Sequence, residues 1–370
     1  MHKIQDTSTR LLSLDVLRGA DLFLLVALQP VLLGVLGPFA GNGVADAVLR
    51  QLDHEAWEGF RLWDLVMPLF LFMSGIALPF SIGKYGARRF WLRLARRVLL
   101  LWVLGMVVQG NLLDFDLRTL RLYSNTLQAI AAGYLIAAIG VRYLPRGGQL
   151  ALAAALLIIY AVPMTLCGDW TPGGNFAEGV DRAVLGRWRD GVWWDGGGAW
   201  HFAADYSYTW VWSTLTFGFS VLSGALVGGV VRRPASRGRA LRVLLVAGVA
   251  MVAAGLLWSV QMPVVKRLWT SSMALYSSGL CTLLFALTYW WTDVRGHRRG
   301  LRWLCVFGRN SIAAYLLGEW LNLRPVAAQL CYAAESVLGE WYGVLLTGVH
   351  ALLLTALLGL LYRAGMFLRV

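Results

Sequence analysis

The chain has 370 residues, of which 58% are hydrophobic and 14% charged, and its mean hydropathy is +0.61. Soluble domains carry roughly 25% charged residues, so this composition excludes an ordinary soluble fold and favours lipid as the solvent. The net charge of +13 would favour a nucleic-acid partner in a soluble protein. Here the basic residues lie in short loops between apolar runs, which indicates membrane topology signals, and we expect no nucleic-acid partner.

Apolar runs recur along the whole chain, and each is long enough for a helix to cross a bilayer, which takes about 20 residues. We expect about ten spans, at residues 14–36, 62–82, 94–113, 124–143, 149–167, 208–231, 241–260, 271–291, 303–322 and 342–362. The first run has no small-residue cleavage site, so we expect a retained helix and not a cleaved signal peptide. The sequence therefore predicts an all-α, polytopic integral membrane protein that forms one domain over residues 1–370.

Basic residues set the expected orientation, because Lys and Arg are about twice as frequent in the loops on one side of the predicted helices. Basic loops stay in the cytoplasm, so both termini are expected there, which agrees with an even number of helices. Two long loops, at residues 37–61 and 168–207, then lie outside. The second is rich in Trp, Gly and Asp, which suits either sugar stacking or an interfacial tryptophan belt.

His54 is the first candidate for chemistry, because it lies just before the second predicted helix on the external side. Asp53 is its neighbour, and Asp64 lies at the beginning of that helix. Neutral imidazole is the usual general base near neutral pH, and a nearby carboxylate can orient it. His54 is therefore a candidate base, although an ordinary interfacial histidine fits the same pattern.

Two further polar groups admit a functional and a structural interpretation. Asn125 and Gln128, at the beginning of the fourth predicted helix, can hydrogen-bond a substrate or join neighbouring helices. Lys266, Trp269 and Ser271 precede or begin the eighth helix, where they can bind a substrate or anchor and cap the helix. The four cysteines have no metal-binding spacing, so we predict neither a zinc site nor a disulfide framework.

On the cytoplasmic side, three residues are candidates for binding an anion. Arg18 lies in the first predicted helix, and Arg309 and Asn310 begin the ninth. An arginine at a helix N-terminus suits an anionic group, while a salt-bridged helix end is the structural alternative. Composition and spacing do not separate an enzyme from a transporter.

Five stretches together carry a family resemblance, and they follow one another along nearly the whole chain. They are LDVLRG at 14–19, DHEAWEGFRLWDLVMPLFLFMSG at 53–75, SNTLQAIAAGY at 124–134, KRLWTSS at 266–272 and GRNSIAAY at 308–315. The most specific is His–x–x–Trp–x–Gly followed by Asp–Leu–Val–x–Pro. The chain thus resembles the transmembrane acetyltransferases typified by heparan-α-glucosaminide N-acetyltransferase, and in particular their bacterial relatives, which carry a domain of unknown function.

This resemblance implies an acetyltransferase of the bacterial inner membrane that takes acetyl from cytoplasmic acetyl-CoA to an amino sugar or glycan on the periplasmic side. His54 matches the family's active-site histidine, with Asp53 or Asp64 to orient it. Asn125 or the group from Lys266 to Ser271 would hold the oxyanion or the acceptor. Candidates for the CoA phosphates are Arg18, Arg309 and Asn310.

Several alternatives stay open after the resemblance. The acceptor sugar, N- or O-acetylation and a homodimeric assembly are undecided, and direct transfer is preferred over an acetyl-histidine intermediate because it needs fewer steps. The alternative function is an amino-sugar transporter, which would more often show inverted repeats and broken helices around charges at the membrane midplane. The chain shows no such internal repeat.

Overall fold

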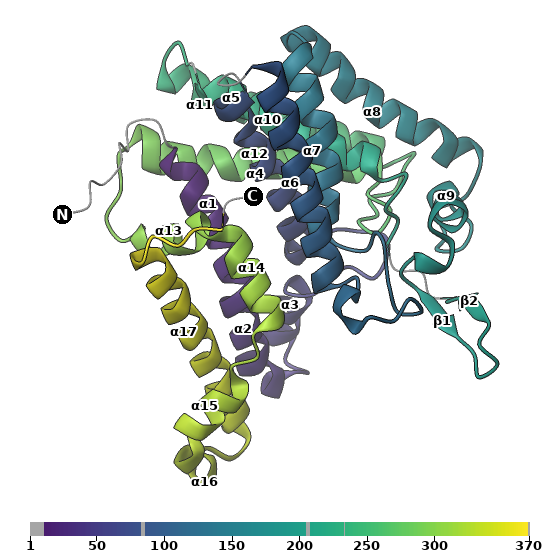
Figure 1. The fold of residues 1–370 in the computed structure, drawn as a ribbon. Helices are drawn as coiled ribbons and strands as arrows, with labels where there is room; N and C mark the ends of the chain where they lie inside the picture. Colours follow the sequence, from purple (N-terminus) through teal and green to yellow (C-terminus); the bar gives the residue numbers. More distant parts are fainter. Residues whose placement is uncertain (1–10, 83–85, 205–207, 233, 369–370) are drawn as a thin grey trace. The chain divides into compact units, whose positions relative to one another are not determined.

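The computed structural model describes residues 11–82, 86–204, 208–232 and 234–368, and this part of the chain is mostly helical with little sheet (Figure 1). Its contacts divide the chain into two compact units. The terminal unit consists of residues 1–52, 237–241 and 283–369, and the central unit consists of residues 53–236 and 242–282. His54, Asp64 and Lys266 belong to the central unit, whereas Arg18 and Arg309 belong to the terminal unit.

The terminal unit contains α1 (Leu12–Phe23), α2 (Gln29–Leu36), α3 (Gly43–Gln51), α13 (Arg302–Arg309), α14 (Ser311–Trp320), α15 (Arg324–Leu330), α16 (Glu335–Leu338) and α17 (Tyr342–Arg363). The central unit contains α4 (Val66–Ile76), α5 (Leu78–Ile82), α6 (Ala87–Val108), α7 (Thr126–Tyr143), α8 (Arg146–Leu166), α9 (Phe176–Leu185), α10 (Thr214–Arg232), β1 (Val192–Trp194) and β2 (Trp200–Phe202). Helices α11 (Arg237–Trp258) and α12 (Ser271–Tyr289) contribute residues to both units.

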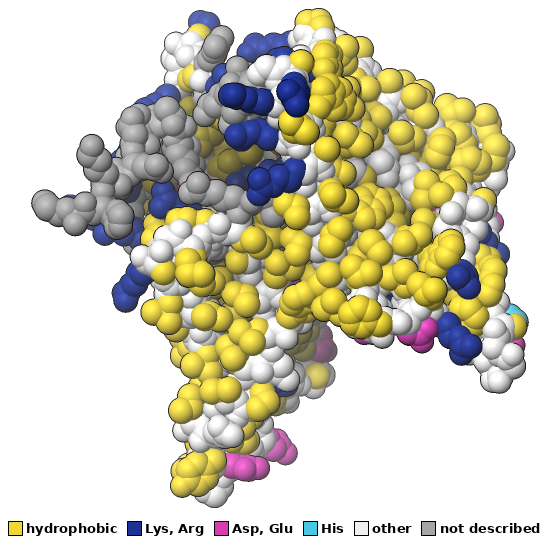
Figure 2. Space-filling model, viewed as in Figure 1, with side chains coloured by type: hydrophobic (Ala, Val, Ile, Leu, Met, Phe, Trp, Pro, Cys, Tyr) yellow, Lys and Arg dark blue, Asp and Glu magenta, His cyan; other side chains and the backbone are white. Residues whose placement is uncertain are grey.

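Eight helical segments among the described residues are long and apolar enough to cross a membrane. They are Leu12–Phe39, Leu62–Ile82, Thr126–Tyr143, Arg146–Leu166, Thr214–Arg232, Arg237–Trp258, Ser271–Val294 and Tyr332–Arg363. Hydrophobic side chains cover much of the face shown in Figure 2, as expected for a surface in contact with lipid tails. The chain is therefore a multi-pass membrane protein by the length and composition of its helices.

Two of the ten expected spans are not among these eight, for different physical reasons. The segment expected at 94–113 lies mostly within α6, a 22-residue helix whose first half carries several arginines and is too charged to qualify. The segment expected at 303–322 is divided at Asn310 into α13 and α14, of eight and ten residues, which are each too short to span.

The core of the central unit forms where α10 packs closely against α4 and α7. Small residues allow this approach: a Cβ atom on Gly75 would lie 1.9 Å from the carbonyl oxygen of Val221, and one on Gly224 would lie 2.0 Å from that of Phe72. Glycine at such contacts is the usual way in which membrane helices bring their backbones together. The packing holds α4, which directly follows the 3-10 turn that contains Asp64.

In the terminal unit, α1 packs on α13 by the same device. A Cβ atom on Gly19 would lie 1.9 Å from the carbonyl oxygen of Leu304, and one on Gly308 would lie 1.9 Å from that of Asp15. Helix α17 packs against α2 and α15. The α1–α13 contact holds Asp15 close to the arginines of α13.

The two long loops expected from the sequence contain regular structure. The first, 37–61, includes α3, whose N-terminus is capped by the side chain of Asn42. The second, 168–207, of which 205–207 lie outside the described residues, includes α9 and an antiparallel hairpin of β1 and β2. A buried ion pair between Glu178 and Arg189, 2.8 Å apart, joins α9 to the chain before the hairpin.

Candidate functional site

Asp64 is the buried residue that the other side chains of the candidate site contact. It lies in a 3-10 turn, Leu62–Leu65, that leads directly into α4, and its side chain is fully buried. One carboxylate oxygen, Oδ2, accepts hydrogen bonds from the backbone N–H groups of Arg61 (2.9 Å) and Glu55 (3.2 Å). These two bonds hold the carboxylate in one orientation and direct its other oxygen, Oδ1, toward His54.

His54 is anchored on one side and exposed on the other. Its Nδ1 lies 2.8 Å from Oδ1 of Asp64, and 41% of its side chain remains accessible. A half-exposed imidazole with one nitrogen bonded to a buried carboxylate is the arrangement that a general base needs. The structure thus selects Asp64, of the two carboxylates considered from the sequence, as the one that contacts the ring.

Lys266 is brought to this pair by backbone contacts between distant segments. Gly59 N–H donates to the carbonyl of Val264 at 2.9 Å, and Glu58 forms an antiparallel bridge with Val265. The Lys266 Nζ then lies 2.8 Å from Nδ1 and 3.3 Å from Nε2 of His54, and 3.4 Å from Oδ1 of Asp64. A histidine, an aspartate and a lysine therefore form one cluster in the central unit.

The partners of His54 favour one tautomer of its ring. Nδ1 can either donate its proton to Asp64 or accept one from Lys266, but it cannot do both. Because Asp64 is a buried acceptor and Lys266 can donate to Asp64 directly, the favoured arrangement has Nδ1–H bonded to the carboxylate. That tautomer leaves a lone pair on Nε2, which is the atom that can remove a proton from a substrate.

Lys266 itself is almost fully buried, with 5% of its side chain exposed. Burial lowers the pKa of Lys266 to about 8, against the opposing effect of the Asp64 carboxylate.

Hydrogen bonds hold the turn that carries Lys266. Trp269 is buried with a φ of +52° and donates its indole N–H to Ser220, and Thr270 donates its hydroxyl to the carbonyl of Pro263. A left-handed backbone at a bulky residue costs energy and persists only when its surroundings hold it.

Arg61 and Glu55 donate their backbone N–H groups to Asp64 and were not among the site residues expected from the sequence. Arg61 binds the carboxylate of Glu55 through two nitrogens, at 2.7 Å and 2.9 Å. The hydrogen bonds from Arg61 hold the pKa of Glu55 below its ordinary value. The sequence signal for Arg61 was its spacing from Asp64. Arg61 precedes Asp64 by three residues, and the Asp64 carboxylate accepts its backbone N–H as the third helical residue does in a capping box.

The other predicted residues of the central unit make structural contacts. Asp53 is exposed and its carboxylate accepts the backbone N–H of His54 at 2.7 Å. Asn125 caps α7 and donates to the carbonyl of Gly105 at 2.6 Å, and Gln128 bonds the backbone of residues 122 and 124. The hydroxyl of Ser271 donates to the carbonyl of Leu157. Lys266 is therefore the one candidate substrate-binding residue of the central unit whose side chain contacts the side chains of His54 and Asp64.

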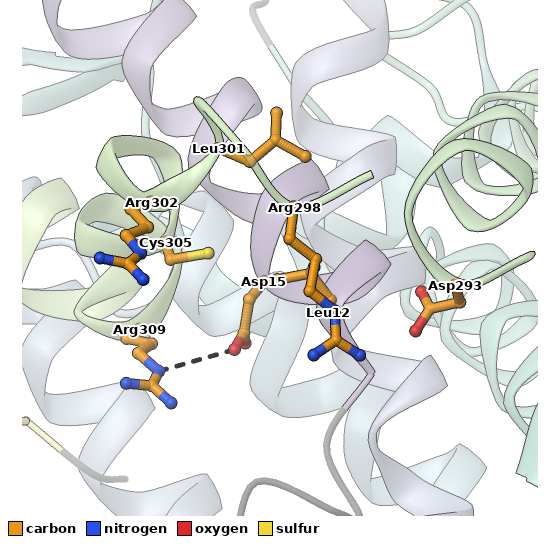
Figure 3. A pocket seen from close by; sticks show the side chains of 8 residues that line it. All are labelled: Leu12, Asp15, Asp293, Arg298, Leu301, Arg302, Cys305 and Arg309. Atoms are coloured by element: carbon orange, nitrogen blue, oxygen red, sulfur yellow. Dashed lines mark ion pairs between the residues drawn. The ribbon is translucent and has the colours of Figure 1, made fainter. Parts of the chain in front are cut away.

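Arg18, Arg309 and Asn310 belong to the terminal unit. Arg309 ends α13 and lies 3.7 Å from the carboxylate of Asp15, and it also donates to the hydroxyl of Tyr362 at 2.8 Å. Asn310 is buried and its amide donates to the carbonyl of Met366 at 3.2 Å. Arg18 lies in α1. Arg309, but neither Arg18 nor Asn310, lines the cavity of this unit that Figure 3 shows.

No protein-family model and no curated protein matches this chain. A search for three or more His, Cys, Asp or Glu side chains grouped as metal ligands finds none among the described residues. The His54 cluster is therefore the part of the structure from which a function can be inferred.

Proposed function

We propose that the chain is a membrane acetyltransferase that moves an acetyl group from acetyl-CoA to an amino sugar, with His54 as the base. The observation that carries the proposal is the 2.8 Å contact between Nδ1 of the half-exposed His54 and the buried carboxylate of Asp64. The resemblance of residues 53–75 to the acetyltransferase family points to the same histidine.

The proposed reaction is direct transfer. The sugar amine attacks the carbonyl carbon of the thioester, a C–N bond forms, and Nε2 of His54 takes the proton that the amine loses. The C–S bond then breaks, and the CoA thiolate takes the proton from Nε2 of His54, which restores the base. Asp64 stabilises the imidazolium that forms on His54, as a buried carboxylate does in other histidine-based sites. Lys266 supplies a positive charge beside the ring, where the oxyanion of the tetrahedral intermediate needs one.

The membrane arrangement in this proposal has ten spans, with both termini in the cytoplasm of a bacterium and His54 near the periplasmic face. Helix α6 can serve as a further span because its 22 residues extend about 33 Å at 1.5 Å per residue. Its arginines lie in the first half and can reach the cytoplasmic headgroups along their aliphatic stems. Helices α13 and α14 together provide the remaining span, the ninth in chain order.

Exposed aromatic rings support a carbohydrate acceptor. In the hairpin, Trp193 is 51% exposed and stacks on His201 with ring centroids 4.8 Å apart, and Trp200 is 40% exposed. Indole rings accept the apolar face of a pyranose, and the Asp195 carboxylate, 2.9 Å from His201, offers a hydrogen-bond acceptor beside them. On the cytoplasmic side, Arg18, Arg309 and Asn310 stay in the proposal as candidates for the CoA phosphates.

The test is a transfer assay on the purified protein in detergent, with radiolabelled acetyl-CoA and a panel of amino sugars. Wild type and His297→Ala should form acetylated sugar, while His54→Ala should not. His297 is the control because it stacks on Trp291 in the basic loop and belongs to the terminal unit, whereas the His54 cluster belongs to the central unit. Full transfer by His54→Ala would overturn the assignment of the base. If no protein forms product and proteoliposomes instead take up glucosamine, the chain is a transporter.

A further inference from the structure

The terminal unit contains a cavity of about 270 Å³, and none of its lining residues belongs to the His54 cluster. It is lined by residues from the beginning of α1, from the chain between α12 and α13, and from α13 itself. They are Leu12, Asp15, Asp293, Arg298, Leu301, Arg302, Cys305 and Arg309. Small-molecule sites usually begin at about 300 Å³, so this volume suits a headgroup-sized ligand.

Three arginines dominate the charge of this cavity. Figure 3 shows the guanidinium group of Arg298 on one side of Asp15, and those of Arg302 and Arg309 on the other. The carboxylates of the lining are already engaged. Asp15 lies 3.7 Å from Arg309, and Asp293 accepts hydrogen bonds from the backbone N–H of Ser13 and the hydroxyl of Thr292, each at 2.9 Å.

Arg298 and Arg302 are exposed, and neither has an acidic side chain of the described residues within 4 Å. Two guanidinium groups without acidic partners at the mouth of a cavity leave a net positive charge there. A planar guanidinium group can donate two parallel N–H···O hydrogen bonds to a phosphate, and its positive charge strengthens both.

The backbone adds a second, independent contribution. Helix α13 begins at Arg302 with no side chain capping its N-terminus, and Leu301 and Arg302 both line the cavity. The first backbone N–H groups of a helix lack partners within the helix and carry a partial positive charge, which favours an anion.

We propose that this cavity binds a phosphate group, held by Arg298, Arg302 and the N-terminus of α13. Two sources carry this chemistry: the headgroup of an anionic phospholipid and a soluble phosphate compound. The basic loop before α13 is expected on the cytoplasmic side, where anionic lipids attract juxtamembrane Lys and Arg. Arg309 of this lining is also a candidate for the CoA phosphates, and CoA is one such soluble compound. The test measures phosphate binding and not acetyl transfer, so its failure is distinct from failure of the transfer assay.

Cys305 lines the cavity and is partly exposed, so its thiol can report occupancy. In a Cys167→Ser, Cys331→Ser background, leaving the buried Cys281 in place, the rate of maleimide labelling of Cys305 is measured in two arms. In neutral detergent, inorganic pyrophosphate is added. In nanodiscs, phosphatidylglycerol is compared with phosphatidylcholine. Protection by pyrophosphate identifies a site open to soluble phosphates, and protection by phosphatidylglycerol alone identifies a lipid site.

The decisive comparison is between two double variants of equal charge. Arg298→Gln with Arg302→Gln should raise the ligand concentration that halves the labelling rate of Cys305 by roughly tenfold or more for each arginine, because each contact to phosphate is charge-assisted. Arg299→Gln with Arg363→Gln removes the same charge from exposed positions that do not line the cavity, and should keep protection.

The inference fails if neither arm protects Cys305, or if the control pair loses as much protection as the cavity pair. Retention of phosphatidylglycerol and pyrophosphate, measured by native mass spectrometry on the same variants, gives the same comparison without relying on the thiol.

Discussion

Replacing Asp64 with asparagine gives the sharpest test of the site, because the structure dictates how the new amide must lie. Asparagine has one acceptor oxygen, whereas the carboxylate uses both. Oδ2 of Asp64 accepts two backbone N–H groups, from Arg61 and Glu55. Turning the amide nitrogen toward them would lose two buried hydrogen bonds, at about 1 kcal/mol each, and bring donors together. The oxygen of the asparagine therefore stays with the backbone, and its NH₂ group faces His54.

The consequence is an inverted tautomer. An NH₂ group facing Nδ1 makes that nitrogen an acceptor, which places the ring proton on Nε2 and removes the lone pair that the proposed reaction needs. The equivalent inversion in serine proteases costs about 10⁴-fold in rate, and loss of one charge-assisted hydrogen bond alone costs about 10- to 100-fold. We therefore expect Asp64→Asn to lower the transfer rate by about 10²- to 10⁴-fold.

The assay is single-turnover transfer from radiolabelled acetyl-CoA, with thermal unfolding in the same detergent to confirm that the variant is folded. Asp53→Asn is the matched control, since Asp53 is exposed and bonds the backbone of His54 but not its ring. It should stay within about threefold of wild type, as surface changes usually do. A folded Asp64→Asn protein with wild-type rate would refute the orientation argument, even if His54→Ala were inactive.

Three further predictions test the lysine and the packing. Burial places the pKa of Lys266 at about 8, so raising the pH through 8 removes its positive charge. The transfer rate of the wild type should fall over that range. The pH–rate profile of Lys266→Met should show a lower rate without that alkaline decline. Asn125→Ala removes a helix cap and a buried hydrogen bond to Gly105, so the free energy of unfolding should fall by about 2–3 kcal/mol, measured through a lower thermal midpoint. Activity per folded molecule should persist. Gly75→Ala should prevent accumulation of folded protein, because its Cβ would lie 1.9 Å from a carbonyl oxygen, whereas Gly229→Ala, which meets nothing within 4 Å, should accumulate normally. Equal yields of these two glycine variants would contradict the packing of α4 on α10.

Local properties of the sequence were enough for the class of the protein and for its helices. A run of about 20 apolar residues must form a helix in lipid, because every backbone group needs a partner within the segment. Eight of the expected spans correspond to such helices among the described residues. The two exceptions, around α6 and Asn310, depend on charge content and a local break, and the ten-span arrangement remains a prediction.

Which polar side chains contact one another depends on the tertiary structure. Asp53 and Asp64 were equal candidates along the chain, but the turn before α4 directs Asp64 to the ring of His54 and leaves Asp53 exposed. Lys266 lies 212 residues from His54 in sequence, and its approach depends on the backbone pairing of residues 58–59 with 264–265. Periodicity and spacing describe neighbours on one element, whereas contacts across elements depend on how those elements pack. Local sequence patterns were therefore enough to predict a membrane protein and to name His54 as a candidate base, whereas the partners of His54 depend on the packing of distant segments.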